Sequence, residues 1–214
     1  ASMMDALPDS VAQPDPNDVL DEWVEDHAPQ LRDALAQLCA VPSTADDAAA
    51  RADALALVTK EAAAAGLGAP ALVADDLVVF AGPESPGAPT VLIYASVNVA
   101  APDAAAWAAA DCKPFAPTTA DGRVGAAGAK DAKAGALAPL YACRALEAVV
   151  GGGPRLLNFK VAVSGAAPGD AAKVLAPHAA ALAADYVLVS DGGGMGAYGA
   201  AKPGAPSLLF GCRG

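Results

Sequence analysis

Apolar and polar positions follow two different periods along the chain, and these periods predict helices that alternate with strands. Apolar residues recur at helical spacing over 20–40, where Asn17 or Asp18 can serve as the N-cap. Pro29 falls inside this segment and should kink or break the helix. The other predicted elements are helices over 45–65, 131–150 and 170–184, a hairpin over 71–81, and strands over 90–95, 156–163, 186–190 and 207–210.

Strands that alternate with helices predict an α/β fold with three layers, αβα, in which a mixed, mostly parallel sheet lies between helices. Residues 1–16 are rich in Pro and Asp and are expected to form a flexible lead-in, so that 17–214 make up a single domain. Residues 100–130 contain no long periodic segment, and long connections of this kind often have a function.

Polar side chains directly follow several of the predicted strands. Ser96 and Asn98 come after the strand over 90–95, Ser164 after the strand over 156–163, and Asp191 after the strand over 186–190. In open α/β sheets, ligands bind at the carboxyl ends of the strands. These positions are therefore the first candidates for a functional site.

The composition narrows the possible functions. Apolar residues make up 55% of the chain but aromatic residues only 5%, so alanine supplies the excess and predicts a thin, closely packed core. The formal net charge of −11 argues against binding to nucleic acid, whose phosphates require a basic surface. No uninterrupted apolar run reaches the ~18 residues of a membrane-spanning helix, so the chain is expected to have no transmembrane segment of its own.

Two features bear on the compartment. The four cysteines form no Cys-x-x-Cys pair, so we expect buried free thiols rather than a metal knuckle or a disulfide framework, which points to a reducing compartment. The chain begins without Met, as it would after removal of a presequence or as a cloning remnant. A mitochondrion or plastid is compatible with the first explanation, and the cytoplasm is the alternative.

Seven short motifs follow one another in an order that resembles a known family. These are VPST (41–44), VLIYASVNV (91–99), KPFAPTTADGR (113–123) after a Trp, GAKDAKAG (128–135), SGAAPGD (164–170), SDGG (190–193) and FGCRG (210–214). In this order they resemble the di-zinc metallopeptidases that include carnosinase-type dipeptidases, aminoacylase and succinyl-diaminopimelate desuccinylase. The resemblance extends from about residue 20 to the last residue.

The resemblance implies where the zinc ligands would lie. The family binds two zinc ions through a His, a bridging Asp, a Glu, a further Asp and a distal His, and a separate Glu is the general base. The family's His-x-Asp reads Ser96-Val97-Asn98 here. Asp131 and Asp191 match the bridging Asp and the further Asp. The Glu-Glu pair falls on Ala166 and Ala167, and the distal His would lie beyond residue 214.

By this resemblance the zinc site is lost, and we expect no cofactor and no catalytic residue. Two carboxylates cannot hold two zinc ions, because even a structural zinc site normally uses four protein ligands. Lys130 and Lys133 flank Asp131 and could neutralise its carboxylate. The vacated pocket would then be formed by Ser96, Asn98, Lys130, Asp131, Lys133 and Asp191. His27 and His178 fall in none of the motifs and are expected to be structural or solvated.

The resemblance also implies an incomplete catalytic domain, because family members continue into a lid domain after the equivalent of residues 211–214. With the lid absent, an exposed sheet edge would need a cover. We therefore expect a non-catalytic, metallopeptidase-like structural or docking subunit, whose partners are the other protein subunits of a larger assembly. Two alternatives stay open: a zinc-dependent dipeptidase or amidohydrolase completed by a partner chain, and a module that binds a small ligand in the vacated pocket.

Overall fold

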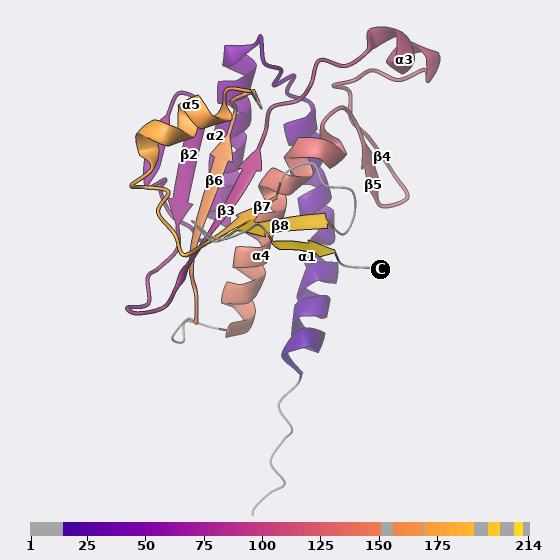
Figure 1. Cartoon of the computed structure of the whole chain (residues 1–214). Helices are drawn as coiled ribbons and strands as arrows, with labels where there is room; N and C mark the ends of the chain where they lie inside the picture. Colours follow the sequence, from indigo (N-terminus) through magenta and orange to yellow (C-terminus); the bar gives the residue numbers. More distant parts are fainter. Residues whose placement is uncertain (1–14, 151–155, 168, 191–196, 202–207, 212–214) are drawn as a thin grey trace, which may run out of the picture.

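The computed structural model of the chain describes residues 15–150, 156–167, 169–190, 197–201 and 208–211. Its centre is a mixed sheet whose described strands lie in the order β1-β2-β6-β3-β7-β8-β9 (Figure 1). The strands are β1 (Leu72–Ala74), β2 (Leu77–Ala81), β3 (Thr90–Ser96), β6 (Asn158–Ser164), β7 (Tyr186–Val189), β8 (Ala197–Ala201) and β9 (Leu208–Gly211).

Parallel pairing joins the three central strands. β3 pairs in parallel with β6 on one side and with β7 on the other, whereas the outer strands pair antiparallel. Ser96 lies opposite Ser164 in this register, so β3 and β6 end side by side. The predicted α/β fold with a mixed sheet is confirmed, and its central strands end at the edge where the candidate residues lie.

One face of the sheet packs against three long helices, α1 (Pro16–Cys39), α2 (Ala48–Ala64) and α4 (Ala134–Val150). Ala54, Ala62 and Ala136 are fully buried among larger apolar side chains of this layer. A methyl side chain fills little space, so the helices can approach the sheet closely. Among the described helices, none is long and apolar enough to span a membrane.

The opposite face is covered by a shorter helical segment, α5 (Ala171–Leu175) and the 3-10 turn η2 (Ala176–His178) (Figure 1). Val174 and Leu175 pack there against Leu77 and Val79 of β2. The expected three layers are therefore present. The helix predicted over 170–184 is shorter than expected, because Pro177 cannot continue α-helical hydrogen bonding.

The first helix also differs from its prediction. It begins at Pro16, and the Asp15 carboxylate accepts a hydrogen bond from the Asn17 N–H, so Asp15 is the N-cap rather than Asn17 or Asp18. The helix continues through Pro29 and does not break. Residues 1–14 of the predicted lead-in lie outside the described residues.

Residues 100–130 contain short elements that the sequence prediction missed. A helix, α3 (Ala104–Ala109), is capped by Asp103, and the strands β4 (Thr118–Ala120) and β5 (Arg123–Gly125) form a hairpin. Asp121 and Gly122 link these two strands with positive φ angles of 49° and 73°. Two successive residues with positive φ are typical of a type I′ hairpin turn. Figure 1 shows this arm projecting from the body of the molecule.

Candidate functional site

A cavity of about 470 Å³ lies at the carboxyl end of β3. Its lining includes Ser96 from the end of β3, Asn98 from the loop that follows, and Trp107 from α3. Gly128 and Asp131 complete the opposite wall. The structure thus brings together Ser96, Asn98 and Asp131, which the sequence had placed in one pocket.

Ser96 and Asn98 are joined by a local hydrogen bond. The Asn98 N–H donates to the Ser96 Oγ over 3.1 Å, and Ser96 is almost completely buried. The Asn98 Nδ2 is also buried, and it has no hydrogen-bond partner within the described part of the chain. A buried amide nitrogen costs free energy when no acceptor reaches it.

A π-helical turn, η1 (Ala129–Lys133), sets the direction of the side chains at the opposite wall. Gly128 precedes it with a φ of 78°, and a Cβ at this position would lie 2.5 Å from Val99 Cγ2. Only glycine combines this backbone angle with so close a neighbour. Asp131 is exposed to the cavity, whereas Lys133, two residues later, points into the protein.

Lys133 is fully buried and does not line the cavity. Its Nζ donates a hydrogen bond to the Val41 carbonyl oxygen over 2.5 Å and lies 5.5 Å from the centroid of the Phe115 ring. Burial lowers the pKa of Lys133 to about 8, and the nearby Cys39 opposes this shift. Burial likewise raises the pKa of the Cys39 thiol, against the effect of Lys133.

The two lysines therefore differ from their prediction. Lys130 is exposed and, like Lys133, is not part of the cavity lining. Neither lysine forms an ion pair with Asp131 in the described structure. The reason is the π-helical turn, which points the Lys133 side chain toward the Val41 carbonyl and away from the carboxylate.

The remaining predicted positions lie elsewhere. Ala166 and Ala167 are not part of the lining, and the neighbouring Ser164 Oγ donates to the Asp76 carbonyl and accepts from the Ala166 N–H. This segment is thus held against the β1–β2 turn. Asp191 lies outside the described residues.

Neither histidine lies at the cavity. His27 stacks on Trp23 with a centroid distance of 3.9 Å, and its Nδ1 lies 2.8 Å from the Trp23 carbonyl oxygen. His178 belongs to η2 on the other face of the sheet. Cys112 is exposed, which corrects the expectation of buried thiols; Cys39 and Cys143 are buried, and Cys212 lies outside the described residues.

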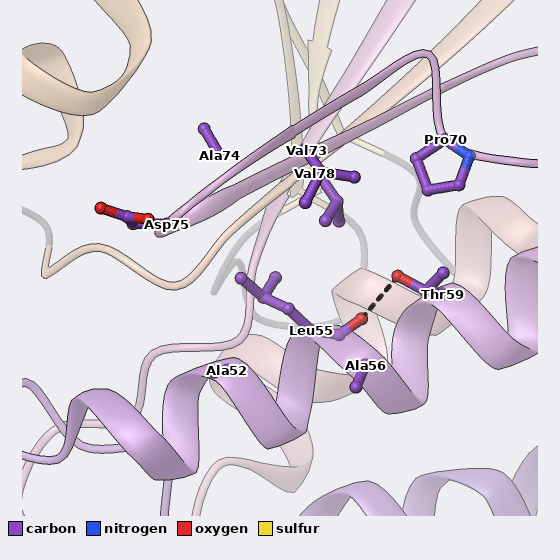
Figure 2. Close-up of a pocket in the computed structure, with 9 residues that line it drawn as sticks. All are labelled: Ala52, Leu55, Ala56, Thr59, Pro70, Val73, Ala74, Asp75 and Val78. Atoms are coloured by element: carbon purple, nitrogen blue, oxygen red, sulfur yellow. Dashed lines mark hydrogen bonds between the residues drawn. The ribbon is translucent and has the colours of Figure 1, made fainter.

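A second cavity, of about 360 Å³, separates α2 from the β1–β2 hairpin (Figure 2). Leu55 of α2 faces Val73 and Val78 of the hairpin across it. The Thr59 hydroxyl already donates to the Leu55 carbonyl oxygen over 2.8 Å. Because its lining is apolar apart from Thr59 and Asp75, this groove lacks a set of groups for catalysis.

No protein-family profile matches the sequence, and no curated protein does. Solved structures do match. Human carnosine dipeptidase 1 superposes with a TM-score of 0.67 and 19% identity, over 84% of this chain and 42% of that one. The dipeptidase Dug1p from Saccharomyces cerevisiae superposes with a TM-score of 0.65 and 15% identity, over 84% of this chain and 42% of that one. The M20 family metallo-carboxypeptidase Sso-CP2 from Sulfolobus solfataricus superposes with a TM-score of 0.61 and 21% identity, over 75% of this chain and 37% of that one.

The chain has the fold of the M20 metallopeptidases. At these identities the likeness concerns the fold, and the chain spans about two fifths of the length of the structures that it matches. The expected resemblance to this group is therefore supported by an independent comparison of coordinates.

The M20 fold implies a metal centre, and the described residues can be tested against it. The cavity offers a serine hydroxyl, a carboxamide and one carboxylate, from Ser96, Asn98 and Asp131. Across the described ranges, no group of three or more His, Cys, Asp or Glu side chains could hold a metal ion. A zinc ion normally needs at least three protein ligands of the imidazole, thiolate or carboxylate type. These residues do not fit a di-zinc centre.

Sequence reasoning missed two contributors to the M20-like cavity. Trp107 was seen only as a motif residue, although Asp103 before a run of alanines is a capping signal that could have placed it on a helix. Gly128 was not singled out, and no local signal in the sequence reveals its contact with Val99. Only the tertiary structure brings Gly128 and Val99 together.

Proposed function

We propose that this chain is a non-catalytic, metallopeptidase-like protein that serves as a structural or docking subunit of a larger protein assembly. The observation behind the proposal is the chemistry at the end of β3. Where the resemblance places a zinc-binding His and its supporting Asp, the chain has Ser96 and Asn98. A hydroxyl is a poor zinc ligand, and Ala166 and Ala167 offer no general base to activate a water molecule.

Loss of the acidic groups is physically coherent in a protein without metal. Carboxylates that cluster without a cation repel one another and resist burial. Replacing them by Ala, Ser and Asn removes that cost while the fold is kept. Function resides in sites rather than in folds, so an M20 fold is compatible with a role in assembly.

A docking role would use exposed apolar surface. Leu156 is 89% exposed and Val73, on the edge strand β1, is 69% exposed. Large exposed apolar side chains favour association with another protein, and Val73 lies at a sheet edge, where a further strand can pair. The partners would be other protein subunits, in a mitochondrion, a plastid or the cytoplasm.

Two measurements on the protein from its native source test the proposal. The first is the zinc content after equilibration with zinc and dialysis, with human carnosine dipeptidase 1 treated in parallel. We expect far less than one equivalent for this chain, and one equivalent or more would contradict the loss of the metal site. The second is the mass of the native particle. We expect that particle to contain other polypeptides beside the one that carries this chain, and migration of that polypeptide alone would contradict the docking role.

The second candidate is a zinc-dependent dipeptidase completed by a partner chain. It is favoured by the match to two dipeptidases over less than half of their length. Hydrolysis of dipeptides by the native particle, abolished by a chelator and by Asp131→Asn, would support this candidate and overturn the first.

A further inference from the structure

We propose that the cavity at the end of β3 binds a small organic cation, an amine or a quaternary ammonium group, in contact with Asp131 and Trp107. This inference does not depend on the docking role, because a ligand site inside the chain is compatible with either outcome of the tests above.

The charge of the cavity selects a single positive charge. Asp131 is the one acidic or basic side chain among the described residues that line it. No cation from the described residues compensates it within the wall, because the Lys133 ammonium is bound to the Val41 carbonyl and Lys130 does not line the cavity. The chain as a whole has a net charge of −11, which disfavours anions further. The one carboxylate that the described residues place in this wall matches one monovalent cation better than two zinc ions.

The rest of the wall suits the alkyl groups of an amine. Ala100, Ala101, Pro102 and Ala132 present small apolar surfaces, and Trp107 adds an aromatic ring. The indole ring attracts cations through its quadrupole more strongly than the other aromatic side chains do. A cavity of about 470 Å³ has the size of ordinary small-molecule sites.

One group in the wall would favour a different ligand. The buried Asn98 Nδ2 is a donor without a partner, and a donor calls for an acceptor such as a carboxylate. However, this nitrogen is inaccessible to solvent, so in this structure it does not face the cavity. The Ser96 oxygen beside it already accepts from the Asn98 N–H and keeps a second lone pair. The Ser96 hydroxyl can donate or accept, so it opposes neither kind of ligand, and Asp131 and Trp107 favour a cation.

Nuclear magnetic resonance of the full chain tests the proposal directly. Tetramethylammonium is the probe, tert-butanol is its uncharged isostere, and acetate is a small anion. A Trp23→Phe background leaves the indole N–H of Trp107 as the single indole signal. With the ionic strength held constant at about 0.15 M, and with up to about 0.1 M probe, we expect a saturable shift of this signal with tetramethylammonium and none with the other two compounds.

Variants identify the groups responsible. Asp131→Asn should weaken tetramethylammonium binding about threefold to tenfold, because it removes the ion pair and keeps the shape. Asp121→Asn is the matched control, since this carboxylate lies exposed on the β4–β5 turn outside the cavity, and it should leave binding unchanged. Equal binding of tert-butanol, preferential binding of acetate, no saturable shift, or an unaltered affinity in Asp131→Asn would each overturn the proposal. None of these results would bear on the mass of the native particle.

Discussion

Gly128 is the residue on which the shape of the cavity wall depends most directly. It combines a φ of 78° with a position where a Cβ would lie 2.5 Å from Val99 Cγ2. Gly128→Ala should therefore lower the free energy of unfolding by about 2–4 kcal/mol, from backbone strain and overpacking together. Urea denaturation followed by circular dichroism measures this.

Gly122 offers the matched control. Its φ is 73°, but a Cβ there would meet no atom within 4 Å. Gly122→Ala should cost only the backbone term, about 1 kcal/mol. Equal losses in the two variants would show that the contact with Val99 does not contribute.

Lys133 should make stability depend on pH. Its pKa is about 8 in the folded protein and 10.5 in the reference state. Between these values the unfolded chain holds a proton that the folded chain has lost, so the free energy of unfolding rises with pH. From pH 7 to 10 the rise should be on the order of 1–3 kcal/mol relative to Lys133→Met, which lacks the titrating amine.

The comparison with Lys133→Met is needed because the raised pKa of Cys39 acts in the opposite direction. Lys133 and Cys39 also shift each other's pKa, so both proteins are compared in a Cys39→Ala background, where their difference isolates the lysine. Lys130→Met, which alters the exposed neighbour, should follow the wild-type pH curve. Denaturation at several pH values measures the free energy of unfolding of the three proteins. Parallel pH curves for the wild type and Lys133→Met would contradict the prediction.

Residue by residue, the sequence predicted where the site lies better than how its side chains point. Ser96 and Asn98 could be placed because a side chain directly after a parallel strand must lie at the sheet's carboxyl edge. The direction of the Lys133 side chain could not be predicted, because it depends on a π-helical turn and helical periodicity assumes α geometry. The local sequence does not reveal that difference.

At the scale of elements, an ion pair ties α2 to the β1–β2 hairpin. The Arg51 guanidinium donates to both oxygens of Asp76, over 2.8 and 3.2 Å, and both side chains are largely shielded from solvent. Arg51→Lys should lower the free energy of unfolding by about 1 kcal/mol, because lysine cannot form the paired hydrogen bonds.

The exposed pair between Lys173 and Asp170 on α5 is the control for this variant. Lys173→Met should not change the denaturation midpoint measurably, since water screens the pair. If Arg51→Lys also left the denaturation midpoint unchanged, the contact between Arg51 and Asp76 would not contribute to joining the helix and the hairpin.

The elements themselves were predictable where they were long and periodic. The hairpin over 71–81 and the strand over 90–95 could be predicted from an Asp-Asp turn and a continuous apolar run. The arm over 100–130 escaped prediction because α3, β4 and β5 are too short to show a period. The local signals available were Asp103 as a helix cap and the Asp121-Gly122 turn.

For the whole molecule, stability should be distributed unevenly. β3 and β6 lie at the centre of the sheet and are mostly buried, whereas the strands of the β4–β5 hairpin are largely exposed. In hydrogen exchange of the full chain, the amides of the arm should exchange at least about a thousandfold faster than those of β6. Comparable protection of the two would contradict this division.

The three-layer architecture itself could be predicted from the order of the elements, because strands that alternate with helices leave few other arrangements. The coverage of the second face was harder to foresee, since Pro177 shortens the helix there. The order of the layers could thus be predicted from the sequence, whereas the length of the helix on the second face could not.

The π-helical turn at Ala129–Lys133 has a consequence for changes in chain length. Removing one residue from an α-helix rotates everything beyond it by about 100°, which would turn the buried side of α4 toward water. A π turn contains one surplus residue, so a deletion within it restores α geometry and leaves the packing of α4 in place. The segment Ala129–Lys133 can therefore lose one residue while α4 keeps its buried face.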